Sequence, residues 1–173
     1  MVTELEVLSL NGMGATSGCP DAVTVPLSNV TLFNTIGGTL PPFLWDMPQL
    51  RTAHLSGNGC TGSIPSACMT STVILRDLSL AHNKLSGPIP LTVFNISKPD
   101  LSSHQLLGRV SADWPPKAEI KLELNRLSGQ LPQTGLEGVR GGSVAVLRGN
   151  MFLCGSIPGN DHFEDDYVCG CSN

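Results

Sequence analysis

Leucines recur along the chain in a pattern that combines strand-like alternation with a turn. The clearest copy, LRDLSLAHNKLSGPIP, occupies residues 75–90. Leu78 and Leu80 are two residues apart, so both lie on one face of a strand, and Ser79 points to the other face. The asparagine three residues later can donate to and accept from the backbone of neighbouring segments. Glycine and proline then favour a turn, because glycine permits conformations closed to other residues and proline restricts itself and its predecessor.

This pattern occurs seven times, and the copies end at residues 20, 41, 65, 90, 111, 132 and 158. One copy cannot bury its own leucines, whereas stacked copies form a continuous core. The sequence therefore predicts a solenoid of the α/β repeat class over residues 1–158, with about seven coils, a parallel concave sheet, convex turns and short helices. Cys60 occupies a leucine position and is predicted to be buried. His104 replaces the asparagine of the fifth coil and is predicted to brace that turn.

The run Asn-x-Leu-Ser-Gly-x-Ile/Leu-Pro, at residues 83–90 and 125–132, resembles the plant-type extracellular leucine-rich repeat. This type occurs in receptor-kinase ectodomains, polygalacturonase-inhibiting proteins and kinetoplastid surface antigens. The ending RGNMFLCG at residues 148–155 is similar to the final repeat of the family, which usually passes into a cysteine-bearing cap. The resemblance implies a leucine-rich-repeat solenoid followed by a cap over residues 159–173, at an extracellular or cell-surface location.

Composition and charge exclude several classes of function. The formal net charge is -4, and lysine and arginine are scattered singly, so no basic stripe predicts a nucleic-acid partner. No stretch approaches the roughly 20 apolar residues of a spanning helix, and residues 1–6 lack the features of a signal peptide. We therefore expect any membrane attachment to come through segments outside this chain.

The six cysteines are unevenly distributed. Cys154, Cys169 and Cys171 lie within the last 20 residues, which predicts a local disulfide cap in which Cys154 pairs with one of the other two. Zinc binding by these cysteines and His162 is the less favoured alternative, because Cys-x-Cys spacing is tighter than the usual gap. The acidic run 164–166 is interpreted as solvated surface and not as a calcium site. No metal and no cofactor is predicted.

No catalytic motif is recognisable in the chain. Four histidines and 14 acidic residues could in principle form an acid and base pair, but none lies in a supporting motif. The sequence also contains neither a nucleophile elbow nor a phosphate-binding loop. We therefore expect no enzymatic activity.

Function is instead expected on the concave face, where strands hold the residues that alternate with buried leucines. One side chain from each strand forms an inner column on this face, and the column is predicted to end at Val146. Lys98 and Lys117 are predicted to lie on the convex side. Charge collects toward the C-terminal half, and such groups set specificity and register. The candidate binding residues are Phe33, His54, Ser79, His82, Asp100, Ser102, Glu119, Lys121, Glu123 and Arg148.

Two triplets match the glycosylation acceptor pattern, Asn29-Val30-Thr31 and Asn95-Ile96-Ser97. Asn95 is predicted to lie on the convex side, whereas Thr31 falls in an expected strand. The predicted function is an extracellular binding module that recognises a protein, peptide or glycan ligand through its concave face. The alternative is a structural surface-coat or adhesion spacer module without a dedicated ligand. A transmembrane helix and kinase in the flanking sequence would favour the binding module of a receptor. A lipid anchor or a stalk would favour the coat or adhesion module.

Overall fold

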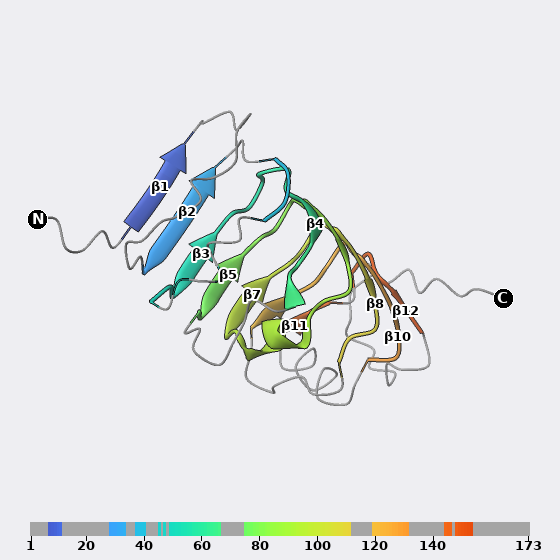
Figure 1. Cartoon of the computed structure of the whole chain (residues 1–173). Helices are drawn as coiled ribbons and strands as arrows, with labels where there is room; N and C mark the ends of the chain where they lie inside the picture. Colours follow the sequence, from blue (N-terminus) through green and yellow to red (C-terminus); the bar gives the residue numbers. More distant parts are fainter. Residues whose placement is uncertain are drawn as a thin grey trace, which may run out of the picture.

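The computed structural model describes residues 7–11, 28–33, 37–40, 45, 47, 49–66, 75–111, 119–131, 144–146 and 148–153. Over these residues the chain winds into a solenoid with two parallel sheets (Figure 1). The first, called the long sheet, contains β1 (Val7–Asn11), β2 (Asn29–Phe33), β3 (Thr52–His54), β5 (Asp77–Ser79), β7 (Lys98–Asp100), β9 (Ile120–Lys121) and β11 (Val144–Ala145). The second, called the short sheet, contains β4 (Thr61–Ser63), β6 (Lys84–Gly87), β8 (Gln105–Gly108), β10 (Arg126–Gly129) and β12 (Met151–Phe152). The predicted leucine-rich-repeat solenoid is confirmed.

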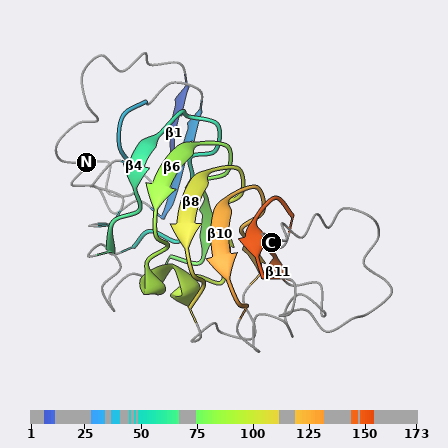
Figure 2. The ribbon, with the colours of Figure 1, turned by 90° about the vertical axis from the view of Figure 1, so that its right-hand side faces the viewer.

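From the third coil on, each coil places one strand in the long sheet and then one in the short sheet, whose strands lie side by side in Figure 2. The long sheet has seven strands and the short sheet has five. With strands in both sheets, the solenoid makes about four turns, so it has somewhat fewer coils than the seven predicted. In the second coil, pairing on the side of the short sheet is reduced to an isolated bridge between Thr39 and Thr61.

Among the described residues, the convex connection after β6 contains a short helix, as predicted. The 3-10 helix η3 (Leu91–Asn95) connects β6 to β7 and buries Val93 and Phe94. Proline precedes it, with an extended backbone at Pro90. Because proline fixes its own backbone angle, it favours this change of direction after the short sheet.

The leucine positions form the core between the two sheets. In the fourth coil Leu78, Leu80 and Leu85 are fully buried, and their counterparts in neighbouring coils are buried as well. Cys60 replaces the third of these leucines in its coil and is also fully buried, which confirms that prediction. Burying one leucine-sized side chain contributes about 1.5–3 kcal/mol, so contacts between stacked coils stabilise the solenoid.

Buried asparagines connect successive coils through an array that we call the asparagine ladder. Asn83 Nδ2 donates to the carbonyl of Leu80 in its own coil (2.6 Å) and to that of Leu55 in the preceding coil (2.9 Å). Its Oδ1 accepts from the amides of Asn58 (3.0 Å) and Cys60 (2.9 Å). Bonds of the same kind are made by Asn58, Asn125 and Asn150. The ladder therefore satisfies backbone groups at the turn between the two sheets.

His104 interrupts the asparagine ladder in the fifth coil. Its side chain is buried, and neither ring nitrogen has a hydrogen-bond partner. Burial lowers the pKa of His104 below its usual value of 6.5, while the carbonyls of Asn83 and Leu80 and the carboxylate of Asp100 oppose this shift. The ring therefore fills the ladder position but forms none of the hydrogen bonds that the asparagines form there.

The last coil has one residue more than predicted between its strand and its asparagine. β11 pairs Ala145 with Lys121, and Val146 is buried. Asn150 Nδ2 donates to the carbonyl of Val146, four residues earlier, whereas the separation in other coils is three. Val146 therefore belongs to the core and does not lie on the outer face as predicted.

Candidate binding face

Three columns of side chains cover the outer face of the long sheet, because alternate strand residues point the same way. The register of the paired strands defines the columns. The first column holds Asn29, Thr52, Asp77, Lys98 and Glu119. The middle column holds Thr31, His54, Ser79, Asp100 and Lys121. The third column, beyond the strand ends, holds Ser56, Ala81, Ser102, Glu123 and Arg148.

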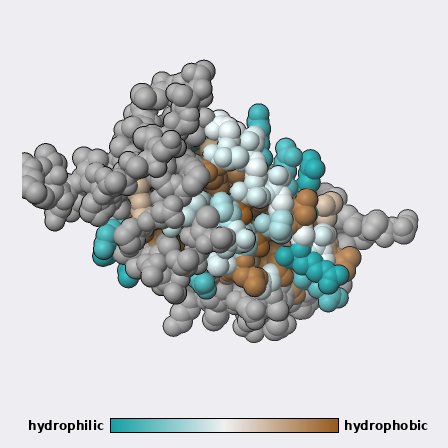
Figure 3. Space-filling view, viewed as in Figure 1, coloured by the Kyte–Doolittle hydropathy of each residue, from teal (hydrophilic) through white to brown (hydrophobic). Residues whose placement is uncertain are grey.

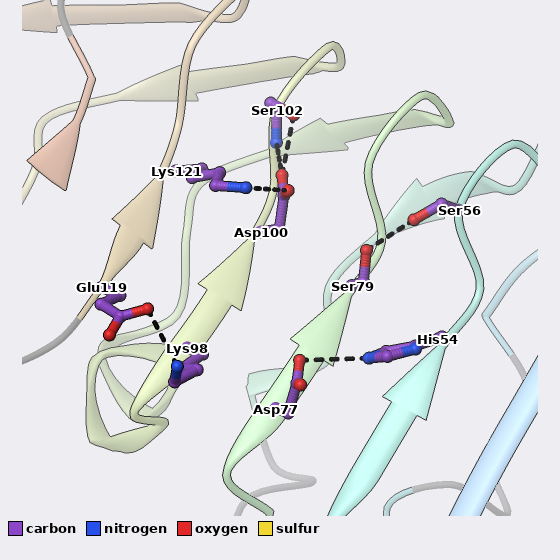
Figure 4. A network of polar contacts seen from close by, with 9 residues as sticks. All are labelled: His54, Ser56, Asp77, Ser79, Lys98, Asp100, Ser102, Glu119 and Lys121. Atoms are coloured by element: carbon purple, nitrogen blue, oxygen red, sulfur yellow. Dashed lines mark hydrogen bonds and ion pairs between the residues drawn. The ribbon is translucent and has the colours of Figure 1, made fainter. Parts of the chain in front are cut away.

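The third and fourth coils contribute a half-exposed contact between a histidine and a carboxylate and a pair of hydroxyl groups to the face. His54 Nε2 lies 3.2 Å from Asp77 Oδ1, diagonally across β3 and β5 (Figure 4). The hydroxyl groups of Ser56 and Ser79 form a hydrogen bond, with their oxygens 2.6 Å apart. These contacts fix side chains of the third and fourth coils relative to one another.

Asp100 is the centre of a second cluster (Figure 4). Its Oδ1 accepts from the hydroxyl (2.7 Å) and the amide (3.2 Å) of Ser102, and its Oδ2 lies 3.4 Å from Lys121 Nζ. Beside it, Lys98 Nζ lies 3.1 Å from Glu119 Oε2. Exposed ion pairs contribute only about 0–1 kcal/mol each, so their main effect is to order the charges of this face. In the space-filling view, a band of residues of intermediate hydropathy crosses the described surface, and hydrophilic residues gather around it (Figure 3).

Comparisons with known proteins agree with this architecture. The model of the Leucine Rich Repeat family matches residues 75–96. Receptor-like protein 31 of Arabidopsis thaliana is 31% identical over 94 residues, which are 53% of this chain and 11% of that protein. The crystal structure of Pollen Receptor Kinase 3 has 25% identity and a TM-score of 0.62, and covers 79% of this chain and 67% of that one. The repeats of this chain are leucine-rich repeats of the plant type, similar to those of these receptor proteins.

A third similar structure is the Arabidopsis receptor kinase HAESA in complex with the peptide hormone IDA and the co-receptor SERK1. It has 25% identity and a TM-score of 0.58, and covers 73% of this chain and 22% of that one. This leucine-rich repeat chain spans only about a tenth of the length of the curated relatives that it matches. The activity of a whole receptor therefore does not follow for this chain.

The structure brings most of the predicted binding residues of this leucine-rich repeat chain onto one face. Glu123 and Arg148 lie in the third column, and neither forms an ion pair with another described residue. His82 is exposed but lies one residue beyond the third column, at a left-handed turn with a φ of 56°. Phe33 belongs to β2, and its side chain lies outside the described part of the chain. The residues placed in the polar clusters are His54, Ser79, Asp100, Ser102, Glu119 and Lys121.

Three residues of these clusters were absent from the predicted site. Ser56 and Asp77 could have been found from strand alternation, because Asp77 precedes the buried Leu78 by one residue. Lys98 was predicted on the convex side, and this is wrong, since it lies in β7 and pairs with Glu119. The reason is Pro99, which occupies a buried strand position that the leucine pattern did not indicate.

The two glycosylation triplets differ in their surroundings. Asn95 ends η3 and is exposed on the convex side. Asn29 is half-buried in β2, its Nδ2 donates to Ser28 Oγ (3.3 Å), and Thr31 lies in the same strand. Asn95 is therefore the more accessible of the two asparagines.

Some predictions fall on residues that the structure does not describe. Cys154, Cys169 and Cys171, the proposed cap over 159–173 and Lys117 all lie outside the described residues. Across the described residues, no group of three or more histidine, cysteine or acidic side chains could hold a metal ion. No helix among them is long and apolar enough to cross a membrane.

Proposed function

We propose that this chain is a non-enzymatic extracellular binding module that recognises a protein or peptide across the outer face of the long sheet. The observation that carries the proposal is the ordered cluster around Asp100, where one carboxylate is held by both Ser102 and Lys121. Charged groups fixed before a partner arrives need less ordering on binding, and they specify register more than raw affinity.

The dimensions of the face suit an extended peptide. Seven parallel strands, spaced by about 4.8 Å, form a ladder of about 29 Å. An extended chain advances by about 3.3 Å per residue, so roughly nine residues of a peptide could lie across the strands. The HAESA structure, in which the same fold is in complex with a peptide hormone, supports this mode of use.

An extracellular location is part of the proposal. The relatives are receptor-like proteins, and the accessible triplet at Asn95 lies on the opposite side from the proposed face. A glycan there would leave the long sheet uncovered.

Selection from a phage-displayed library of random 12-residue peptides on the immobilised chain tests the proposal. Peptides enriched on the chain should bind at least about tenfold more weakly to the Lys121→Ala, Glu123→Ala double variant, a loss of about 1.4 kcal/mol or more. The matched control is Lys84→Ala, because Lys84 is exposed on β6 in the short sheet.

Equal losses from both variants, or loss only from Lys84→Ala, would contradict the proposed face. Failure to enrich any peptide, together with binding on a glycan array that needs Lys121, would replace the peptide by a glycan. If neither the peptide selection nor the glycan array yields a ligand, the alternative of a spacer module without a dedicated ligand would be favoured.

A further inference from the structure

Five successive coils place a residue in the left-handed backbone region immediately before the ladder position. Glycine fills this place in the third and seventh coils, at Gly57 (φ 70°) and Gly149 (φ 66°). The coils between them carry side chains there, at His82 (φ 56°), Ser103 (φ 61°) and Leu124 (φ 56°). Glycine adopts this conformation without strain, whereas a bulky residue such as leucine rarely does. Leu124 is therefore the strongest departure from what the backbone favours.

Packing in the core does not explain the left-handed conformation of Leu124, because 47% of its surface is exposed. The neighbouring coil leaves room for it: a Cβ atom on Gly149 would lie 2.7 Å from Leu124 Cδ2 and 3.1 Å from its Cα. The backbone at Gly149 thus passes directly against Leu124 and admits no side chain of its own. An exposed leucine in a strained conformation, with space kept beside it, indicates a contact that is made outside the chain.

The charges beside Leu124 point to the same conclusion. Glu123 precedes it, and the amide of Leu124 donates to the carbonyl of Arg148 (2.8 Å). Elsewhere on the face, Asp100 with Lys121 and Lys98 with Glu119 neutralise each other's charge in ion pairs. Glu123 and Arg148 are neighbours in the third column and form no ion pair with any described residue, so Leu124 lies one residue beyond an acidic and a basic residue.

We infer that the site formed by Glu123, Leu124 and Arg148 docks a polypeptide segment that carries an apolar side chain next to an acidic one. The apolar side chain packs on Leu124, and the acidic one pairs with Arg148, whose guanidinium presents two parallel donors to a carboxylate. A basic group of the same segment pairs with Glu123. This inference rests on the proposed function and names the chemistry of its partner.

His82 and Ser103 extend this site along the same edge of the long sheet. Consecutive coils are joined there by backbone hydrogen bonds from His82 to Ser102 and from Ser103 to Glu123. Strands are spaced by about 4.8 Å, so the His82 backbone lies about 10 Å from that of Leu124. A segment running along this edge would therefore reach polar contacts two coils from its apolar anchor.

Leu124→Gly separates binding from stability, because glycine removes the side chain and also removes the strain. The melting temperature should rise by about 2–4 °C, the response of a chain of this size to relief of a modest strain. Binding of 12-residue peptides selected by phage display on the wild-type chain should fall by at least about tenfold, and Arg148→Ala should cause a similar loss. Lys84→Ala is the control, because Lys84 is exposed on β6 in the short sheet, and it should alter binding by less than about twofold.

The selected peptides should also share a motif of an apolar residue next to aspartate or glutamate. Peptides that lose binding with Lys121→Ala but bind Leu124→Gly as well as wild type would overturn this site and leave the proposed function standing. Failure to select peptides at all would overturn both. A fall in melting temperature for Leu124→Gly would show that the leucine serves the fold, and this also would overturn the inference.

Discussion

Replacing His104 with asparagine should repair the gap in the asparagine ladder. At the equivalent positions, the asparagine amide donates to the strand leucine carbonyl of its own coil and of the preceding coil, and its oxygen accepts an amide of the preceding coil. By the same geometry, an asparagine at 104 would donate to the carbonyls of Leu101 and Leu80 and accept from the amide of Leu85. One carbonyl can serve two ladder asparagines, because that of Leu122 already accepts from two of them.

The size of the effect follows from the new hydrogen bonds and from the smaller side chain. Each buried hydrogen bond contributes about 1 kcal/mol net, so three of them would add about 3 kcal/mol. Asparagine is smaller than histidine, and the poorer packing offsets about 1 kcal/mol of this gain. We therefore expect His104→Asn to raise the free energy of unfolding by about 2 kcal/mol at neutral pH. For a chain of 173 residues this corresponds to a rise in melting temperature of about 4–8 °C.

The difference between the two proteins should grow in acid. Burial lowers the pKa of His104 in the folded chain below the usual 6.5, so the unfolded chain takes up the proton more readily. The stability that depends on neutral His104 is complete above pH 6.5. It declines as the pH falls through 6.5 toward the lowered folded pKa, at up to about 1.4 kcal/mol per pH unit. The asparagine variant has no titrating group at this position, and the other histidines are common to both proteins.

Urea unfolding of both proteins between about pH 7.5 and pH 5, with linear extrapolation to water, measures these quantities. Parallel stability profiles would show that the folded chain accommodates the protonated ring, contrary to the unpartnered burial seen in the structure. A variant that is less stable than wild type at pH 7.5 would show that the ladder cannot extend through the fifth coil. Either result would refute the reasoning.

Three further outcomes are expected. Asn83→Ala should lower the free energy of unfolding by about 3 kcal/mol, because two buried amide groups of the preceding coil lose their acceptor. Urea unfolding measures this loss, and a loss as small as that of the exposed control Asn95→Ala would contradict the prediction. Secretion through a glycosylating host should add a glycan at Asn95, seen as a mass shift on glycosidase treatment that Asn95→Gln abolishes, and an unshifted wild-type mass would count against it. Cys154 should pair with Cys169 or Cys171 and close a loop of about 15 residues that stabilises by roughly 3 kcal/mol; finding Cys154 as a free thiol in nonreducing peptide maps would disprove the cap.

The periodic part of this fold could be predicted from the sequence because the same packing problem recurs in every coil. Leu78, Leu80 and Asn83 each have one favourable place in a stacked coil, and the structure puts them there. The prediction failed where one coil departs from the common length. In the last coil, one extra residue moved Val146 into the core, and the leucine pattern alone did not reveal that shift.

The pairing of charges on the long sheet was harder to predict than their presence. Alternation places Asp77 on the outer face, but its contact with His54 runs diagonally across two strands and depends on their register. Leucine ordinarily avoids the left-handed conformation of Leu124, and the only signal for it in the sequence is the glycine at the same position of other coils, Gly57 and Gly149. Positions of this kind are set by the neighbouring coils and override local preference.

The departures from the repeat cluster in the fifth and sixth coils, and this clustering bears on where the partner binds. The fifth coil carries the unpartnered His104, the sixth carries the strained and exposed Leu124, and the same two coils contribute the cluster of Asp100 and Lys121. In a solenoid, stability is approximately a sum of coil and interface terms, so coils with fully formed ladders on either side can offset a local loss. Residues that are unfavourable for the fold can therefore persist where they contact a partner. On this argument, His104→Asn and Leu124→Gly should both stabilise the chain, but only Leu124→Gly should weaken peptide binding, because His104 is buried and Leu124 is exposed.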